Sequence, residues 1–272
     1  MDHLTEYQID RHPVHYIPDF INEIEEDTLL RKIESSPVGK WRNLPSRRLA
    51  SFVTDFPNLL EKLRATGAFS ATPQGTVNHI ILNEYLPGQG ITPHQDGPAY
   101  HPVVATLTLS SHAVMEYYRY RENSQIVSDD PATKSDEENF GKIIDPVPIL
   151  RLLLGPRSLV ITHGLLYTQH LHGISGARYD IFVSSYVDLD VLKPKYAGEG
   201  DSVQIIYARD IANRGMLGSQ SLRDRFAQLT DSNGKADQRG EEVRLERETR
   251  ASLTCRVVEK TSRAAGKLLK LR

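Results

Sequence analysis

Residues 83–96 read Asn-Glu-Tyr-Leu-Pro-Gly-Gln-Gly-Ile-Thr-Pro-His-Gln-Asp, and the stretch ends in an imidazole and a carboxylate two residues apart. In an extended strand, residues i and i+2 project from the same face, so His94 and Asp96 can reach one ion from a short piece of backbone. His-x-Asp alone is a weak pattern that many chains contain by chance. A metal site built on it needs a third ligand from elsewhere in the chain.

The composition is that of an ordinary folded protein: 272 residues, 39% of them hydrophobic and 25% charged. A net charge of -2 creates no global positive field, so a nucleic-acid partner would need a local basic patch. The single cysteine, Cys255, excludes a disulfide framework and favours a reducing compartment. Neither a signal peptide nor an apolar run of ~20 residues is evident. We therefore expect an intracellular protein of the cytoplasm and nucleus without a membrane partner. The sequence leaves the oligomeric state open, with a monomer favoured.

Two short helices are predicted near the N-terminus, after a short strand within residues 12–21. Asn22 is a suitable N-cap for the first helix. Its predicted apolar stripe consists of Ile24, Leu29, Leu30 and Ile33. The second helix is predicted from Pro57 to Leu63 and ends before Gly67.

Basic residues surround the only tryptophan in residues 40–53. The candidate substrate-binding residues there are Lys40, Trp41, Arg42, Arg47 and Arg48. Bases interleaved with an aromatic side chain can hold phosphates and stack a nucleobase. The alternative is a solvated loop around a half-buried tryptophan. The basic tail of residues 260–272 could also touch phosphate or simply fray.

Short β-type runs dominate the chain from Val77 onward. Strands are predicted at residues 78–86, 103–109, 113–120, 149–154, 158–162, 167–172, 180–187 and 250–257. We expect the second and third of these runs to form one hairpin across residues 110–112. The fourth and fifth should form another across residues 155–157. Many short strands with Gly and Pro turns favour a sandwich or a closed barrel over a parallel sheet.

Two charged stretches interrupt this pattern. Residues 121–141 are polar and acidic, which is typical of a mobile surface loop. Residues 190–249 are predicted to form a charged insertion, partly disordered, with one helix near residues 222–229. We expect the insertion to lie between two strands of a single domain that spans residues 1–272.

Three histidines are candidates for the third metal ligand. His163 lies in a turn, whereas His170 and His172 flank Leu171 and face the same way. Gly173 favours His172, because a glycine lets backbone crowd close to a metal centre. Two histidines and one carboxylate with open positions form the facial triad of non-haem Fe(II) sites. A hydrogen-bonded structural role remains the alternative for each of the three histidines.

Residues 250–256 alternate between polar and apolar side chains. Arg250, Ser252, Thr254 and Arg256 share one face of the predicted strand, and Ala251, Leu253 and Cys255 share the other. Two arginines on an inward face are costly unless an anion compensates them, and arginine grips carboxylates in a bidentate way. A small dicarboxylate that also chelates the metal would satisfy this arrangement. The alternative is the solvent face of an edge strand.

In this order, the motifs resemble those of the AlkB-type Fe(II)/2-oxoglutarate-dependent dioxygenases. The motifs are Asn83-x-Tyr85, His94-x-Asp96, His172 and Arg250-x-Ser252-x-Thr254-x-Arg256. Shorter pieces at residues 16–20, 155–159 and 171–174 support the resemblance, which covers residues 16–257. It implies a mainly β (α+β) fold, namely a double-stranded β-helix or jelly roll with N-terminal flanking helices.

The resemblance implies a role for each matched residue. Fe(II) would be bound by His94, Asp96 and His172. Arg250 would pair with the distal carboxylate of 2-oxoglutarate, assisted by Asn83, Tyr85, Ser252, Thr254 and Arg256. Ser252 departs from the asparagine that several relatives have. Arg178, six residues after His172, is a rival anchor, but only the strand of Arg250 has a second arginine in phase.

The resemblance also implies an activity and a partner. With O2, 2-oxoglutarate would be converted to succinate and CO2 while an N-methyl group is hydroxylated and lost as formaldehyde. A methylated base in DNA or RNA is the expected substrate. The alternatives are a slow nucleic-acid-binding or 2-oxoglutarate-sensing protein and an oxygenase that acts on protein. A metal-binding jelly roll without 2-oxoglutarate is disfavoured by the two arginines of residues 250–256.

Overall fold

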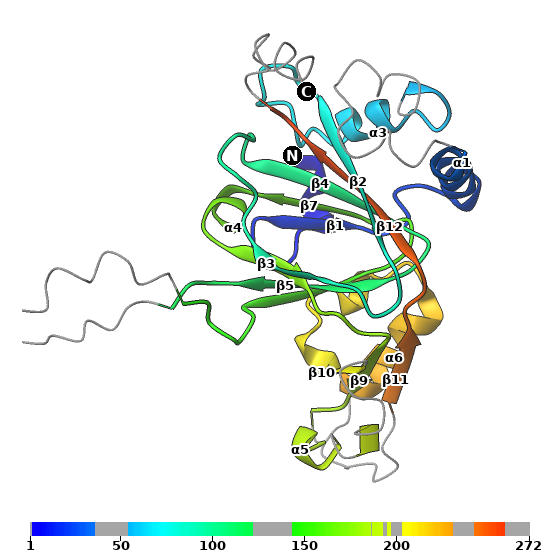
Figure 1. Cartoon of the computed structure of the whole chain (residues 1–272), viewed down its shortest axis with the longest axis vertical. Helices are drawn as coiled ribbons and strands as arrows, with labels where there is room; N and C mark the ends of the chain where they lie inside the picture. The colour runs from blue at the N-terminus through cyan, green and yellow to red at the C-terminus, as the bar shows by residue number, and fades with distance from the viewer. Residues whose placement is uncertain are drawn as a thin grey trace, which may run out of the picture.

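Two antiparallel sheets face each other in the computed structural model, which describes residues 2–35, 54–121, 143–185, 187–192, 195–196, 203–230 and 242–258 (Figure 1). The larger sheet has the order β1 (Val14–Ile17), β7 (Leu159–His163), β4 (Val103–Leu109), β12 (Arg250–Arg256) and β2 (His79–Tyr85). The smaller sheet has the order β3 (Ile91–His94), β8 (Leu171–Ile174), β5 (Ala113–Tyr118) and β6 (Leu150–Leu154). This arrangement confirms the predicted jelly roll.

Strands that follow each other in the chain often lie in opposite sheets. β4 belongs to the larger sheet and β5 to the smaller one, and β6 and β7 are divided in the same way. The two predicted hairpins are therefore wrong: residues 110–112 and 155–157 carry the chain from one sheet to the other. Ser110 and Arg157 adopt positive φ values of 67° and 65° in these crossings. The sharp turns are local, but the pairing partners come from distant strands.

Two N-terminal helices cover the outer face of the larger sheet (Figure 1). The helices are α1 (Glu23–Glu34) and α3 (Leu59–Ala65), and a short 3-10 helix, η1 (Asp2–Tyr7), precedes them. Asn22 and Glu25 form a capping box at the start of α1, as the predicted cap requires. Leu29 is fully buried, whereas Ile24 is 68% exposed. The predicted stripe is wrong at Ile24, because five residues turn ~140° around a helix and place it on another face.

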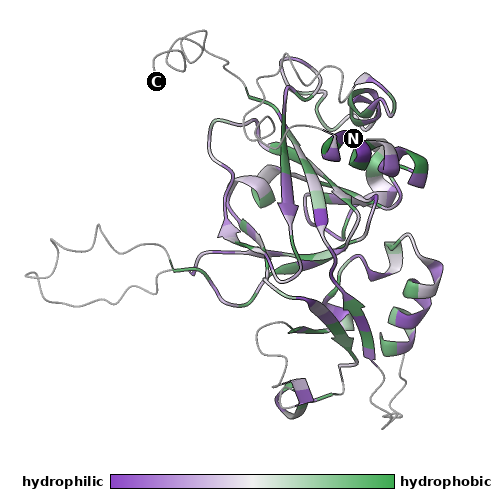
Figure 2. Cartoon of the chain, turned by 45° about the vertical axis from the view of Figure 1, so that its right-hand side comes forward, coloured by the Kyte–Doolittle hydropathy of each residue, from purple (hydrophilic) through white to green (hydrophobic). Residues whose placement is uncertain are grey.

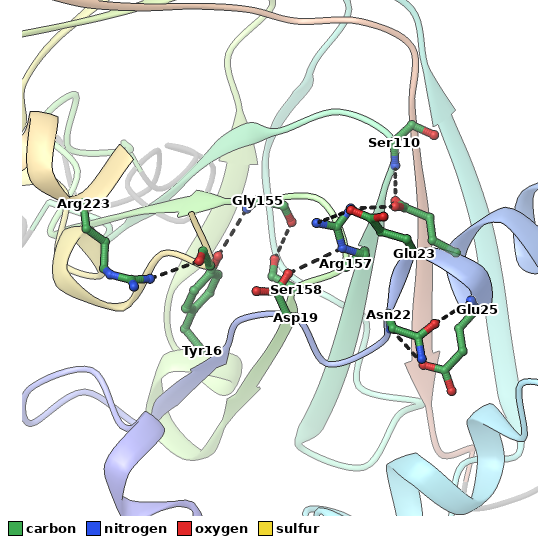
Figure 3. Close-up of polar contacts among 12 residues, drawn as sticks. Tyr16, Asp19, Asn22, Glu23, Glu25, Ser110, Gly155, Arg157, Ser158 and Arg223 are labelled. Carbon is green, nitrogen blue, oxygen red and sulfur yellow. Dashed lines mark hydrogen bonds and ion pairs between the residues drawn. The ribbon is translucent and has the colours of Figure 1, made fainter. Parts of the chain in front are cut away.

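A cluster of ion pairs joins α1 to both crossings between the sheets (Figure 3). Arg157 Nη1 donates to Glu26 Oε2 at 3.1 Å, and Arg157 Nε lies 3.4 Å from Asp19 Oδ1. The other carboxylate oxygen of Glu26 accepts from the Ser110 backbone N–H at 2.8 Å. One helical carboxylate thus fixes two turns of the jelly roll.

A third sheet, formed largely by residues 190–249, lies beside the jelly roll (Figure 1). β9 (Tyr179–Val183) is its central strand, between β10 (Val203–Tyr207) and β11 (Glu242–Glu246). The short helix α5 (Leu189–Leu192), the 3-10 turns η5 (Ala208–Asp210) and η6 (Arg214–Met216), and α6 (Gln220–Thr230) complete this part. The helix predicted near residues 222–229 is confirmed by α6. Strands β10 and β11 were missed, because their partner is a strand that precedes the charged segment.

The helix α6 has one buried face. Its Phe226 packs on Phe182 of β9, with ring centroids 4.9 Å apart. Hydrophilic and hydrophobic residues alternate along the helix, as expected when one face is buried (Figure 2). Within the described ranges, no helix has the length and apolarity that a membrane span requires.

Candidate active site

Strands β3 and β8, with the residues that follow β3, bring together three side chains that could bind a metal. His94 ends β3, Asp96 follows two residues later, and His172 lies in β8. His94 and His172 are paired across the two antiparallel strands, and their ring centroids lie 4.5 Å apart. One ligand atom from each of the three residues lies within 4.8 Å of the others. Two nitrogens and one oxygen thus converge on one point inside the jelly roll.

The surroundings of Asp96 and His172 leave a ligand atom of each available to a divalent metal. Arg256 Nη2 lies 2.5 Å from Asp96 Oδ1, while the buried Oδ2 atom has no hydrogen-bond partner within the described structure. Burial raises the pKa of Asp96, and the charges of Arg256 and His94 oppose this rise. Burial, with His94 and Arg256, lowers the pKa of His172 to about 3, so its ring is neutral at physiological pH. A free carboxylate oxygen and a neutral imidazole fit Fe(II).

The larger sheet supplies the opposite wall of the cavity. Its lining residues include Asn83, Tyr85, Arg250, Ser252, Thr254 and Arg256, while Ala251, Leu253 and Cys255 pack into the hydrophobic core behind them. Antiparallel pairing sets Ser252 opposite Asn83 and Arg250 opposite Tyr85. The predicted alternation of β12 is confirmed. The cavity has a volume of ≈ 640 Å³, open solvent at its mouth included.

Arg250 is an uncompensated cation at one end of this cavity. Its side chain is buried, and Nη2 donates to Thr108 Oγ1 at 2.9 Å. Among the residues that the structure describes, no carboxylate lies within ion-pair distance and Nε has no partner. Burial lowers the pKa of Arg250 to about 10, which still leaves the guanidinium protonated at neutral pH. An anionic ligand would balance this charge.

The rival arginine lies elsewhere. Arg178 is exposed and does not line the cavity. Its side chain lies close to Gly88, in the turn between β2 and β3. This placement favours Arg250 as the carboxylate anchor.

The other two candidate histidines do not line the cavity. His163 stacks on His15, with ring centroids 5.3 Å apart. His170 Nδ1 lies 3.1 Å from the Leu165 carbonyl oxygen. Both side chains therefore contact other protein groups outside the cavity, which agrees with the alternative of a structural role.

Gly173 allows close packing of two strands. A Cβ atom there would lie 3.0 Å from both the Ile91 carbonyl oxygen and the Pro93 nitrogen of β3. The sequence predicted that this glycine gives room beside the metal. The backbone it accommodates is that of the neighbouring strand, and the effect is to bring His94 toward His172.

Several cavity residues were missed in the sequence. They are Thr106 of β4, Tyr117 of β5, Thr162 of β7 and Tyr167. The alternation of threonines in β4 could have revealed the first, but Tyr167 was predicted to lie in a strand and instead lies in the helix α4 (Gly164–Thr168). The Tyr167 hydroxyl is buried and without a hydrogen-bond partner in the described part of the chain.

The candidate substrate-binding residues cannot be placed. Lys40, Trp41, Arg42, Arg47 and Arg48 lie outside the described residues, and so does the basic tail of residues 260–272. Their role remains a prediction from the sequence.

Comparison with known proteins assigns the chain to a family. No family model matches it. The chain is 37% identical over 191 residues to a zebrafish (Danio rerio) protein named "Probable RNA/DNA demethylase ALKBH6", which covers 65% of this chain and 75% of that relative. This chain belongs to the AlkB family. It is therefore an Fe(II)- and 2-oxoglutarate-dependent dioxygenase, and the donor set of His94, Asp96 and His172 matches that requirement.

Two further proteins with AlkB names match at lower identity. The "Alkylated DNA repair protein ALKBH8 homolog" of Arabidopsis thaliana is 25% identical over 170 residues, which cover 54% of this chain and 46% of that relative. The solved structure of OsALKBH1 is 12% identical and covers 92% of this chain and 100% of its own, with a TM-score of 0.40.

Residues from both sheets line the cavity of this AlkB protein, and each sheet contributes different functional groups. Bound Fe(II) and 2-oxoglutarate supply the oxidising power, with O2 as the oxidant. His94, Asp96 and His172 would hold the metal, and Arg250 of the larger sheet would face the far carboxylate of the cosubstrate.

Proposed function

We propose that this AlkB-family dioxygenase oxidatively demethylates a base in nucleic acid, either DNA or RNA. The observation that carries the proposal is one cavity with three metal-binding side chains on one wall and an uncompensated guanidinium on the other. The zebrafish relative, named as an RNA/DNA demethylase, supports a nucleic-acid substrate. Such a substrate would be met in the cytoplasm and nucleus.

The two ends of the cavity suit two different ligands. The end near the start of β12 has Arg250, Tyr85 and Asn83, and it suits the anionic cosubstrate. Along β12 the other arginine, Arg256, lies six residues away, a span of ~20 Å. Arg256 contacts Asp96 of the metal site at 2.5 Å, so this end holds the metal, and we place the methylated substrate beside it.

Aromatic side chains surround the Arg256 end. The Arg256 guanidinium lies 4.8 Å from the ring centroid of Tyr100, and His79 packs on the same ring at 5.7 Å. Tyr167 adds a buried hydroxyl from α4, and burial raises its pKa to about 12, so it remains a donor at neutral pH. Aromatic faces and a hydrogen-bond donor are suited to an extruded base, which must leave its stack to reach the metal.

The overall reaction balances without a further co-reactant. An N–CH3 group, 2-oxoglutarate and O2 give N–CH2OH, succinate and CO2, and the hydroxymethyl group then leaves as formaldehyde with a proton returned to nitrogen. The role of His94, Asp96 and His172 is to hold the metal throughout. Arg250 fixes the far carboxylate, so that the chelating end of 2-oxoglutarate faces the metal.

The first test is anaerobic. Fe(II) and 2-oxoglutarate are added to purified protein under nitrogen, and the visible metal-to-ligand charge-transfer band is recorded. We expect the band in the wild type, its loss in His172→Ala, its weakening in Arg250→Ala, and no change in the matched control Arg178→Ala. Absence of the band in the wild type would reject the oxygenase.

The second test concerns the substrate. Single-stranded DNA and RNA oligonucleotides with one N-methylated base are supplied with O2, and succinate and formaldehyde are measured. We expect both products to rise together with at least one oligonucleotide. Succinate that does not respond to any oligonucleotide would favour a sensor, and a nuclease-resistant activity on methylated peptides would favour a protein substrate.

A further inference from the structure

Two buried arginines, Arg247 just after β11 and Arg250 at the start of β12, lie three residues apart, and their surroundings differ. Arg247 Nε and Nη2 each donate to Asp180 at 2.7 Å, in a bidentate pair. Its Nη1 atom donates to the Ser175 carbonyl oxygen at 2.6 Å, and Nη2 also donates to Gln204 Oε1 at 2.9 Å. Arg250, in contrast, has no carboxylate partner within the described ranges. Arg247 is thus held by the protein itself, and Arg250 is left for a ligand.

The partners of Arg247 come from two strands and from the residue that follows a third. Asp180 lies in β9, Gln204 lies in β10, and Ser175 directly follows the last residue of β8. Because β8 carries the metal ligand His172, Arg247 connects the strand of the metal to the strand of Arg250. Gln204 comes from the charged segment of residues 190–249, so that segment takes part in the connection.

Further contacts fix the same region. His112 Nε2 lies 3.0 Å from Asp180 Oδ2, and it comes from the crossing between β4 and β5. The backbone N–H of Glu248 donates to Ser111 Oγ at 2.9 Å. Arg247, His112 and Arg250 line one small pocket beside the main cavity, so no element intervenes between the network and the anchor.

The distance that 2-oxoglutarate can span between its two carboxylates is limited. 2-Oxoglutarate would chelate the metal at one end and present its other carboxylate to Arg250, so its affinity would depend on the distance between the metal ligands and Arg250. Side chains that hold ligating residues in place commonly change affinity without touching the ligand.

We propose that Arg247 is a positioning residue for 2-oxoglutarate. Held by Asp180 and Ser175, it sets the distance between Arg250 and the metal ligands. Gln204 tunes this distance from the segment of residues 190–249. The inference rests on the proposed Fe(II)/2-oxoglutarate site and adds to it a role for residues outside the cavity.

The test compares two chelators on the Fe(II)-loaded protein under nitrogen. 2-Oxoglutarate spans the metal and Arg250, whereas oxalate chelates the metal but is too short to reach the arginine. In Arg247→Lys we expect the Kd for 2-oxoglutarate, measured from the charge-transfer band, to rise roughly 10- to 100-fold. The Kd for oxalate, measured by calorimetry, should remain unchanged. Gln204→Ala should shift the Kd for 2-oxoglutarate in the same direction by a smaller factor.

Two controls separate positioning from a general loss of structure. In an Arg250→Ala background the anchor is gone, so Arg247→Lys should cause no further rise in the Kd for 2-oxoglutarate. Arg157 is another partly buried arginine, and its carboxylate partner Glu26 lies on α1. Arg157→Lys should lower the melting temperature without changing the Kd for either chelator.

Three outcomes would overturn the inference: an unchanged Kd for 2-oxoglutarate in Arg247→Lys, equal weakening of both chelators, or additive effects of Arg247→Lys and Arg250→Ala. If Arg247→Lys does not fold, the same comparison is made with Gln204→Ala. A ratio of the Kd for 2-oxoglutarate to the Kd for oxalate that equals the wild-type ratio would then reject the proposal. Absence of the band in the wild type would instead reject the proposed function.

Discussion

Arg250 donates to Thr108 Oγ1 at 2.9 Å, and no carboxylate of the described chain approaches its guanidinium. A buried charge without a partner lowers stability, so we expect Arg250→Met to raise the free energy of unfolding of the metal-free protein by about 1–3 kcal/mol. The same change should remove the stabilisation that Fe(II) with 2-oxoglutarate gives the wild type. Thermal unfolding with and without both ligands measures the two effects.

The control for this experiment is Arg178→Met. Arg178 is exposed, so its replacement should change the free energy of unfolding by no more than about 0.5 kcal/mol. Loss of ligand stabilisation in Arg178→Met but not in Arg250→Met would move the anchor to Arg178.

Two neighbouring histidines provide a matched pair. His172 lines the cavity, whereas His170 contacts the Leu165 carbonyl oxygen outside it. His172→Ala should lower the affinity for Fe(II) by more than about 100-fold, because a ligand is lost, and His170→Ala should leave it within a few-fold. Calorimetric titration with Fe(II) under nitrogen measures both. Similar losses in the two variants would contradict the assignment.

Tyr167→Phe should affect turnover of the methylated substrate but not binding of 2-oxoglutarate. The hydroxyl is buried without a partner in the described structure, so its removal should not lower the melting temperature. The Kd for 2-oxoglutarate and the slow succinate formation without substrate should stay at wild-type values. Turnover of a methylated oligonucleotide should fall about tenfold, the effect of one lost hydrogen bond. A changed Kd for 2-oxoglutarate would place Tyr167 at the cosubstrate end instead.

Gly173→Ala should weaken the metal site through the backbone. The added methyl group would lie 3.0 Å from backbone atoms of Ile91 and Pro93, and backbone cannot move aside as a side chain can. We expect β3 to shift away from β8, which separates His94 from His172 and lowers Fe(II) affinity about tenfold or more. Gly97→Ala is the control, because a Cβ atom there meets nothing within 4 Å. Equal Fe(II) affinity in both variants would disprove this reasoning.

The ion pair of Asp180 predicts a dependence of stability on pH. Burial raises the pKa of Asp180, but the hydrogen bonds and charges of His112 and Arg247 outweigh burial and bring the pKa below its ordinary value. A carboxyl group whose pKa is depressed on folding stabilises the protein above its unfolded-state pKa of about 3.9. That contribution is lost as the pH falls through the lower, folded-state pKa.

Urea denaturation between pH 3 and pH 7 tests this dependence with the wild type and Asp180→Asn. At neutral pH the variant should be less stable by about 3–5 kcal/mol, because Arg247 loses its charged partner. The difference should shrink as the pH falls below about 4. An equal difference at both ends of the range would show that Asp180 titrates normally.

Strand character and the facing of side chains were readable in the sequence. The alternation of residues 250–256 predicted which side chains of β12 enter the cavity and which enter the core, and the structure confirms it. Likewise, the short spacing of His94 and Asp96 predicted a shared site. The first inference rests on the two-residue period of a strand, a property of the local backbone, whereas Asp96 lies just beyond β3 and reaches the site from the segment after it.

Pairing between strands was decided only by the tertiary structure. The predicted hairpins at residues 110–112 and 155–157 are instead crossings between sheets, and β10 and β11 add to a strand that precedes them in the chain. Asp96 pairs with Arg256 and Asp180 pairs with Arg247 across long stretches of sequence. A period of two shows which way a side chain points but not which strand lies beside it, because the choice of partner depends on how distant apolar faces are buried together.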